Sequence, residues 1–302
     1  MKTKLLLPVL AVIVCFLIVN CAPILAAELT SKQLKDIENA IKKIKDKARG
    51  VQKEGYDELL SIGPDATSQL IDLLKDKTVE REALRQACNL LGEYKTKDKE
   101  AVTVLIYTLK NPSYTVRAAA CEALGKIADQ SAAEELLGML VDEESLVREK
   151  AAYALISFDN KTIPGKVCEL LKDKDESVRV AAITLLNEKL DPATINSIIN
   201  TLQKDKAPKA RQIAARALGG LKKKETVDVL MESVVEDSDN LVREECASAL
   251  GQINDAKAVP ALIEAIKDGY KDVQLKALYS LKKITGQDFG RDYEKWSHWY
   301  KK

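Results

Sequence analysis

The sequence predicts an all-α protein, a right-handed α-solenoid of about seven helix pairs with capping helices at both ends. The first observation is that the stretch Ser113–Asp129, SYTVRAAACEALGKIAD, recurs along the chain with few changes. The second is that the steps between its anchor positions are 31, 31, 32, 32 and 31 residues. These anchors are Arg117, Arg148, Arg179, Arg211, Arg243 and Gln274. A fixed period in this range is typical of solenoids, in which each unit buries its apolar face only against its neighbours.

The composition agrees with a helical array and limits the partners. Charged residues make up 31% of the 302 residues, and aromatic residues only 5%. This composition is typical of helical proteins with little aromatic packing. The formal net charge is +1, so there is no strongly basic field to attract a polyanion, and we expect no nucleic-acid partner.

Residues 1–27 have the pattern of a secretory signal peptide. A short basic start is followed by the apolar run Leu5–Val19 and by small residues up to Ala27. This order is typical of an export signal, and the apolar run is short for a membrane span. We therefore expect an exported protein of the periplasm or cell envelope.

The processing of this segment is left open between three alternatives. Cleavage after Ala27 would release a soluble exported protein. The stretch Ile18–Cys21 resembles a bacterial lipobox, with Asn20 where a small residue is usual. Processing there would end the signal at residue 20 and place a lipid on Cys21. The third alternative is an uncleaved anchor, so Cys21 or the N-terminal segment is a candidate membrane tether.

N-terminal capping helices are predicted over residues 28–62. Thr30–Gln33 has the form of a capping box, and a helix is expected over Thr30–Arg49, ending at Gly50. A second, short helix is expected over Tyr56–Ile62. The first helix is rich in lysine, so two interpretations arise: contact with an anionic membrane, or a lid over the first repeat. We favour the lid. Its apolar stripe consists of Leu34, Ile37, Ile41, Ile44 and Ala48.

Helix pairs are predicted over residues 63–284, after a turn at Gly63–Asp65 whose proline starts the next helix. The first helices carry Leu, Ile or Val at helical spacing. They are expected over Ala66–Lys75, Glu100–Lys110, Ala132–Val141, Ile163–Lys172, Ala193–Lys204, Glu225–Glu236 and Lys257–Lys267. The second helices are Ser113–Asp129 and its copies. These copies are Glu82–Tyr94, Leu146–Phe158, Ser177–Leu190, Lys209–Leu221, Leu241–Ile253 and Asp272–Ile284.

The repeated residue types explain how the second helices pack. In Ser113–Asp129 one stripe holds alanines together with larger aliphatic residues. Its members are Val116, Ala120, Ala123, Leu124 and Ile127. Alanines allow helix axes to approach closely, while Leu and Ile fill the space between layers. We expect this stripe to be buried in every repeat.

A polar residue lies six positions before each anchor. It is Asn111 before Arg117, and an aspartate before the others. These aspartates are Asp142, Asp173, Asp205, Asp237 and Asp268. We expect these residues to cap the second helices and to bind an arginine of their own or a neighbouring turn. Repetition in every layer indicates a structural device, because chemistry needs only one site.

The tail, residues 285–302, departs from the repeat and is predicted to be an aromatic C-terminal cap. It holds both tryptophans of the chain. A terminal repeat needs a lid over its open apolar face. The predicted stripe consists of Phe289, Tyr293, Trp296 and Tyr300, with Trp299 beside it.

Residues for catalysis or metal binding are scarce. The chain has one histidine, His298, and no Cys-x-x-Cys pair. Most metal sites and nucleophilic sets need more than this. Cys88, Cys121, Cys168 and Cys246 are interpreted as small buried hydrophobic residues. A disulfide between Cys88 and Cys121 is left open, since an exported location permits it. We expect no catalytic residue, no cofactor and no metal.

The pattern D-x5-R joined to VR-x2-AA-x2-ALG-x-I, at a period of 31–32 residues, resembles the short bacterial HEAT repeats named after phycobilisome lyase subunits. The resemblance covers about Gly63–Ile284. It implies that the second helices line the inner curve of a solenoid. It also implies a contrast with the diiron hydroxylases built on HEAT repeats, which need several His–Glu pairs that this chain lacks.

One row of residues on the second helices, five after each anchor and at the matching place in Glu82–Tyr94, points away from the buried stripe. This row, called the ridge, consists of Asn89, Glu122, Tyr153, Thr184, Arg216, Ser248 and Tyr279. Its varied chemistry suits a protein partner, and Tyr and Arg are frequent at interface hot spots. We therefore predict a non-catalytic protein-binding scaffold or adaptor of the bacterial cell envelope. The alternatives are an accessory subunit of a tetrapyrrole (bilin) lyase system, implied by the resemblance, and a purely structural spacer.

Overall fold

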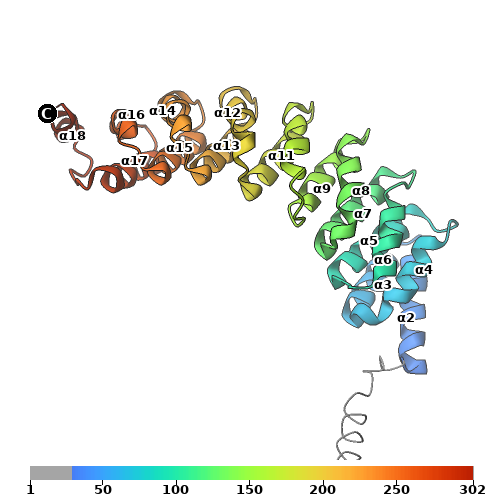
Figure 1. The fold of residues 1–302 in the computed structure, drawn as a ribbon. Helices are drawn as coiled ribbons and strands as arrows, with labels where there is room; N and C mark the ends of the chain where they lie inside the picture. Colours follow the sequence, from blue (N-terminus) through green and yellow to red (C-terminus); the bar gives the residue numbers. More distant parts are fainter. Residues whose placement is uncertain (1–28, 302) are drawn as a thin grey trace, which may run out of the picture. The chain divides into compact units, whose positions relative to one another are not determined.

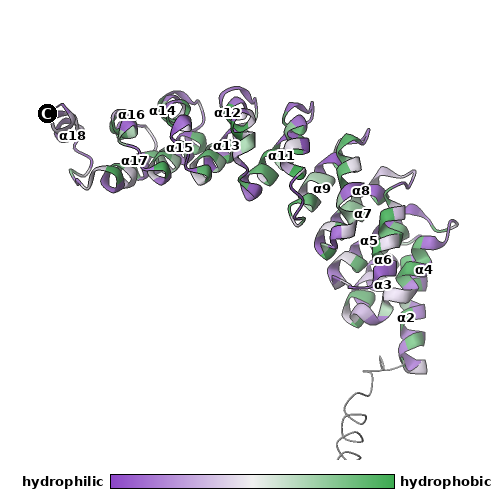
Figure 2. Cartoon of the chain, viewed as in Figure 1, coloured by the Kyte–Doolittle hydropathy of each residue, from purple (hydrophilic) through white to green (hydrophobic). Residues whose placement is uncertain are grey.

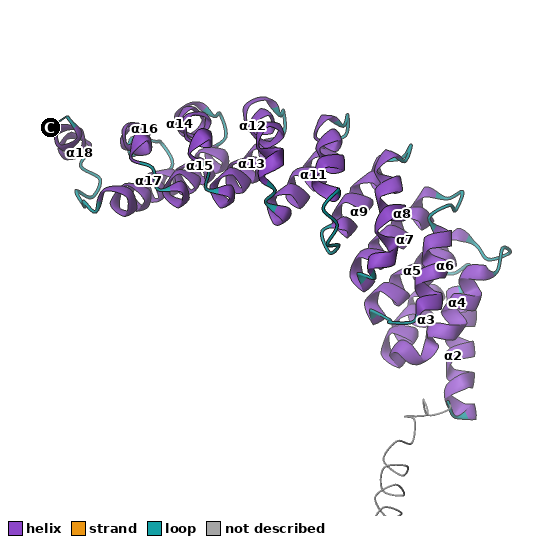
Figure 3. Cartoon of the chain, in the orientation of Figure 1, coloured by secondary structure: helices purple, strands orange, loops and turns teal. Residues whose placement is uncertain are grey.

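The computed structural model describes residues 29–301, and every regular element in this range is a helix (Figures 1 and 3). The prediction of an all-α protein is therefore confirmed. The chain divides into two compact units, Met1–Gln69 and Leu70–Lys302. The predicted signal segment, including Cys21, lies outside the described residues. None of the helices between residues 29 and 301 is long and apolar enough to cross a bilayer.

The first unit is built on two helices, α2 (Ser31–Ile44) and α3 (Arg49–Ile62), which pack against each other. The predicted capping box is present at the start of α2. The Thr30 hydroxyl accepts the backbone N–H of Gln33 at 3.2 Å, and the Gln33 side-chain oxygen accepts the N–H of Thr30 at 2.9 Å. Two orphan donors of the first turn are satisfied in this way.

The predicted end of the first helix was wrong. The helix stops at Ile44 instead of reaching Arg49, and Gly50 lies in the first turn of α3. The connection is held by Asp46, whose carboxylate accepts the N–H of Ala48 at 2.8 Å. The backbone carbonyl of Asp46 accepts the Gln52 side chain at 2.6 Å. An aspartate that binds the N–H two residues on favours a turn over a continuing helix.

The second unit is a two-layer array in which each second helix packs directly on the next (Figure 1). These second helices are α5 (Arg81–Tyr94), α7 (Tyr114–Ile127), α9 (Ser145–Leu155), α11 (Glu176–Lys189), α13 (Pro208–Leu221), α15 (Asn240–Ile253) and α17 (Lys271–Thr285). The first helices are α4 (Thr67–Lys75, which crosses the boundary between the units), α6 (Lys99–Thr108), α8 (Ala133–Gly138), α10 (Ile163–Val167), α12 (Ile195–Lys204), α14 (Val227–Glu236) and α16 (Val259–Ala265). An α-solenoid of helix pairs is confirmed.

The first helices are shorter than predicted, because several of their turns are 3₁₀ rather than α. The second halves of two predicted helices are η3 (Met139–Val141) and η4 (Cys168–Lys172). Such tight turns are common at helix termini. Others occur at or next to the starts of first helices: η1 (Gly63–Ala66), η2 (Gln130–Ala132), η5 (Pro192–Thr194), η6 (Lys224–Thr226) and η7 (Ala256–Ala258).

The core of the second unit lies between neighbouring helices, each of which carries both hydrophobic and hydrophilic residues (Figure 2). The predicted stripe of α7 is buried from Val116 to Leu124, whereas Ile127 is half-buried. The corresponding residues of the next repeat are all buried: Val147, Ala151, Ala154, Leu155 and Phe158. Phe158 lies three residues beyond the end of α9, so this second helix is shorter than predicted. Burial of a stripe on each helix stabilises the array only when neighbours cover it on both sides.

The aromatic tail forms the helix α18 (Tyr293–Tyr300), which packs on α16. Trp296 is buried, and its indole N–H donates to the carbonyl of Gly290 at 2.9 Å. Its ring meets that of Phe289 edge to face, with 4.9 Å between centroids. Two details of the predicted stripe were wrong: Phe289 precedes the helix, and Tyr300 is exposed.

Candidate functional site

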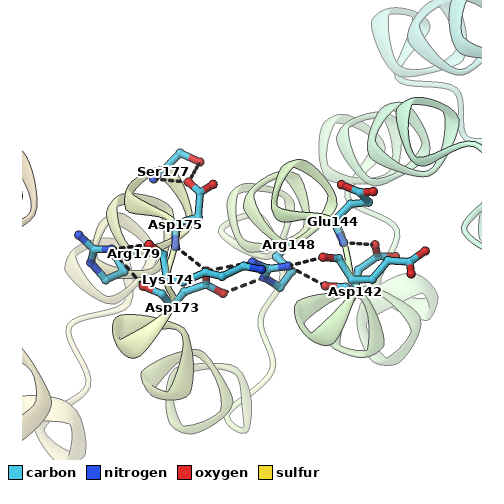
Figure 4. A network of polar contacts seen from close by, with 9 residues as sticks. Asp142, Glu144, Arg148, Asp173, Lys174, Asp175, Ser177 and Arg179 are labelled. Atoms are coloured by element: carbon cyan, nitrogen blue, oxygen red, sulfur yellow. Dashed lines mark hydrogen bonds and ion pairs between the residues drawn. The ribbon is translucent and has the colours of Figure 1, made fainter.

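The anchor arginines and the aspartates form a ladder of clamps between successive repeats. Arg148 donates from Nε and Nη2 to the carboxylate of Asp173, 25 residues later, at 2.7 and 2.9 Å. The Nη1 of Arg148 donates at 2.8 Å to the backbone carbonyl of Asp142, which lies in the turn that precedes the helix of Arg148. Figure 4 shows this arrangement from Asp142 to Arg179. The bidentate geometry is the strong form of an arginine–carboxylate contact.

The same clamp recurs at five interfaces. The sequence left open whether an arginine binds the aspartate of its own or a neighbouring turn. The structure shows that it binds the side chain of the next repeat and a backbone carbonyl of its own turn. The pairs are Arg117–Asp142, Arg148–Asp173, Arg179–Asp205, Arg211–Asp237 and Arg243–Asp268. The ladder of charge-assisted hydrogen bonds is therefore confirmed, and its role is to join the repeats.

The prediction that these aspartates cap the second helices was wrong, because they lie two residues before the N-cap positions. Asp173 lies two residues before the N-cap, Asp175, and accepts its backbone N–H at 2.9 Å. The carboxylate has to face the arginine of the preceding repeat, so it cannot also cover the first turn of the helix. Only some N-cap side chains bind the first turn, among them Asp175 and Asp239. The N-caps of the anchored helices are Ser113, Glu144, Asp175, Ala207, Asp239 and Tyr270.

The ladder lowers the pKa of three aspartates. Burial alone would raise the pKa of Asp142, but the hydrogen bonds from Arg117 and from the N–H of Glu144 outweigh it. Burial would also raise the pKa of Asp173, but the hydrogen bonds from Arg148 and from the N–H of Asp175 outweigh it. Burial also opposes the lowered pKa of Asp268, which results from Arg243 and the N–H of Tyr270. All three carboxylates are therefore charged at neutral pH.

We expect the free energy of unfolding to fall as the pH is lowered below about 4, the ordinary pKa of aspartate. Asp142, Asp173 and Asp268 have lowered pKa values in the folded chain, so the unfolded chain takes up protons first. The stabilisation is complete above the unfolded pKa and is lost as the pH drops through the folded values. Urea unfolding at several pH values between 7 and 3 measures this. A stability that rises on acidification would contradict it.

The ladder has an end and a gap. At the C-terminal end Gln274 replaces arginine and keeps only the bond to its own turn, from Nε2 to the carbonyl of Asp268 at 2.6 Å. The gap lies in α5. The anchor is the fourth residue after the N-cap, so the N-cap Glu80 places Leu84 at that position. Leu84 was not named among the predicted anchors, although Asn89, five residues after it, was placed in the ridge.

The ridge lies on the second helices, and its members are exposed or half-buried. Tyr279 is 70% exposed and Tyr153 38%, while the Arg216 side chain is 48% exposed. The structure does not bring the ridge residues into one cluster, since each belongs to a different helix. Only ridge residues of successive second helices lie close to each other, so the ridge is an extended surface rather than a pocket.

Several ridge residues bind side chains of their own helix or of the adjacent one. Glu122 pairs with Lys126 at 2.9 Å and with Lys150 at 3.6 Å. Arg216 donates to Glu245 at 2.6 Å. Burial raises the pKa of Tyr153, and a hydrogen bond with Thr184 acts in the opposite direction. These contacts hold the ridge side chains in defined positions, which lowers the entropy cost of binding a partner.

The cysteines of the described chain are free thiols. Cys88, Cys121 and Cys246 are buried, and Cys168 is half-buried. The disulfide between Cys88 and Cys121 is not formed. Burial raises the pKa of Cys88 to about 12 and also raises those of Cys121 and Cys246. A thiol with a raised pKa is a poor nucleophile and metal ligand, so these residues pack as small hydrophobic groups.

Among residues 29–301, no group of three His, Cys, Asp or Glu side chains lies close enough together to hold a metal ion. The single histidine, His298, is exposed on α18. The polar groups that the fold does assemble repeatedly are those of the ladder. Their hydrogen bonds join repeats to one another, so the ladder is not a site for a ligand.

The family model of HEAT repeats matches residues 67–156, 163–248 and 195–282. No curated protein sequence matches the chain significantly. Among solved structures, the chain is similar to YibA of Escherichia coli, with 22% identity over 84% of this chain and 98% of that one, and a TM-score of 0.64. It is also similar to an engineered protein, with 20% identity over 82% and 78% and a TM-score of 0.53.

A further structural match is the complex of CpcE and CpcF of phycocyanin lyase from a Nostoc species. The identity is 18%, over 86% of this chain and 96% of that one, and the TM-score is 0.43. At these identities the likeness to solved structures shows the fold alone.

Proposed function

The chain belongs to the HEAT-repeat family, and we propose that it acts as a non-catalytic protein-binding scaffold or adaptor of the bacterial cell envelope. One observation carries the proposal. The close packing of successive second helices arrays the ridge residues along a single layer, with Tyr153, Arg216 and Tyr279 exposed on it. HEAT repeats commonly mediate protein–protein interactions, and an array of this kind offers an extended binding surface.

The chemistry of the ridge favours a protein over a polyanion or a small molecule. Its residues are a mixture of amide, carboxylate, hydroxyl, phenol and guanidinium groups, and no charge dominates. Tyrosine and arginine supply large contact areas and directed hydrogen bonds at interface hot spots. The ridge therefore has the features expected of a protein interface, with Tyr153, Arg216 and Tyr279 as its main contacts.

The envelope location is supported by the pattern of residues 1–27. A basic start, an apolar run and small residues before a polar sequence are typical of export signals. Fractionation of the native cells tests this part. Recovery from the periplasm or from a membrane fraction supports it, and recovery from the cytoplasm alone contradicts it. A mass shift at Cys21 would establish lipidation.

We expect the double variant Tyr153→Ala/Arg216→Ala to bind its envelope partner about tenfold or more weakly than the native chain does, because two hot-spot side chains are removed. The measurement is cross-linked capture on the purified chain, quantified by mass spectrometry, followed by titration of the recovered protein. The matched control is Lys224→Ala/Tyr300→Ala, which removes two exposed side chains away from the ridge.

Two outcomes would contradict the ridge assignment: unchanged binding by the ridge variant, or equal loss by the control. Circular dichroism shows whether the helices remain, since Arg216→Ala also removes the partner of Glu245. Uptake of a bilin or haem by residues 28–302, visible as an absorbance band, would contradict the non-catalytic scaffold itself.

A further inference from the structure

The gap in the ladder coincides with a hollow in the second unit. This hollow, called the turn hollow, lies between the C-terminal end of α4, the start of α5 and the turn from α6 to α7. It has a volume of about 540 Å³. Its apolar wall includes Leu74, Val79, Leu84 and Tyr107. Tyr107 is 68% exposed, so an apolar surface is open to a partner here.

Two substitutions relative to the other repeats accompany this hollow. At the five clamped interfaces an arginine of one repeat binds an aspartate of the next. At the interface of α5 and α7 the arginine position holds Leu84 and the aspartate position holds Asn111, and both line the turn hollow. A leucine does not span the gap between the repeats as a guanidinium does. The turn hollow therefore has an apolar wall at the place where the five other interfaces have a clamp.

The rim of the turn hollow is basic. Lys75, Lys77, Arg81 and Lys110 line it, against Asp76 as the one acid among its lining residues. Lys75 pairs with Glu100, which stands outside the hollow, at 2.5 Å. Lys77, Arg81 and Lys110 are exposed. Three exposed cations around an apolar wall favour a ligand that is apolar at its centre and anionic at its ends.

A hollow of about 480 Å³ also lies at the equivalent place three repeats further on, and its charge balance is different. Between α11 and α12 the lining includes Arg179 and its partner Asp205, together with Asp173 and Glu176. The clamp is part of the lining there, and three acids offset the surrounding lysines. A basic rim around an apolar wall is therefore a local feature of the turn hollow and not a general property of the turns.

We infer that the turn hollow is a second docking site, separate from the ridge, for an acidic peptide segment that inserts one apolar side chain. The inserted side chain would contact Leu84 and Tyr107, and flanking carboxylates would face Lys77, Arg81 and Lys110. A concave site of this size accommodates a side chain with a few placed polar contacts. An anionic bilayer presents an extended surface instead, so the shape favours a peptide.

Fluorescence anisotropy with the purified chain tests the inference. The probe is a fluorescein-labelled peptide, Asp-Glu-Leu-Phe-Asp-Glu. One control peptide has lysine at the four acidic positions, and another has serine in place of Leu-Phe. We expect the acidic apolar peptide to bind at least tenfold more tightly than either control, because each control removes one of the two complementary features.

The decisive variant is Leu84→Arg/Asn111→Asp, which rebuilds the clamp seen at the five other interfaces and removes Leu84 from the apolar wall of the turn hollow. We expect it to fold with an unchanged or raised Tm and to bind the peptide at least tenfold more weakly. If this variant fails to fold, Tyr107→Ala gives the same readout, since Tyr107 is largely exposed. The ridge variant Tyr153→Ala/Arg216→Ala should bind the peptide as the native chain does.

Three results would overturn the inference. The first is unchanged binding by Leu84→Arg/Asn111→Asp, and the second is equal binding of the lysine peptide. The third is that the native chain binds phosphatidylglycerol vesicles but not the peptide, and that Leu84→Arg/Asn111→Asp abolishes the binding to vesicles. The ridge and the turn hollow are tested by different variants, so failure of one proposal leaves the other standing.

Discussion

Replacing Asp173 by asparagine is expected to lower the free energy of unfolding by about 3 kcal/mol, because it leaves a buried guanidinium without its carboxylate. The side chains of Arg148 and Asp173 are only 9% and 12% exposed. Arg148 would keep its bond to the carbonyl of Asp142, which cannot balance the charge. Urea unfolding followed by circular dichroism measures the loss.

The double variant Arg148→Leu/Asp173→Asn is expected to recover most of this loss, to within about 1 kcal/mol of the native chain. Replacing both members of a buried ion pair removes the unpaired charge, and such replacements are often nearly neutral. The same chain already contains this combination, as Leu84 and Asn111. The single variant Arg148→Leu should be strongly destabilised, because Asp173 would then be the unpaired group.

The matched control for the ladder is Glu143→Gln. This carboxylate lies 3.5 Å from Arg117 but is 83% exposed, so we expect a change below about 0.5 kcal/mol. The double variant could instead lose as much unfolding free energy as the two single variants lose together. That result would mean that Arg148 and Asp173 do not act as a pair. That result would contradict the role assigned to the ladder.

Replacing Gly125 by alanine is expected to cost about 2 kcal/mol, although alanine is the better helix former by about 1 kcal/mol. A Cβ atom on Gly125 would lie 2.7 Å from the Cα of Ala154 and 2.8 Å from its Cβ. The obstacle is the backbone of α9, so the two helices would have to separate. Calorimetric or chemical unfolding gives the change.

The control for this prediction is Gly138→Ala at the end of α8. No atom lies within 4 Å of a Cβ built there, so only the helix propensity should change. We expect a gain of up to about 1 kcal/mol. If both alanine variants gain stability, the close approach of α7 and α9 does not limit the packing. If both alanine variants lose stability, helix propensity does not govern the effect at the exposed Gly138.

Much of the fold could be predicted because its determinants are local and repeated. The period of the Val-Arg and Ala-Leu-Gly pattern identified the helix pairs, and the stripe from Val116 to Leu124 is buried as expected. The capping box at Thr30 was also predictable, because it depends on four consecutive residues. The lengths of the first helices were not, since 3₁₀ and α turns differ by small energies that the sequence pattern does not resolve.

The sequence alone determined which residue types join the repeats: an arginine and an aspartate at fixed spacing, present at five interfaces. Only the tertiary structure decided that each arginine takes the aspartate of the next repeat, because the pattern offers two aspartates and packing brings only one carboxylate within reach. It also decided the meaning of Leu84, which appears in the sequence as one more aliphatic residue. Where it replaces arginine, opposite Asn111, the hollow at this interface has an apolar wall and no clamp.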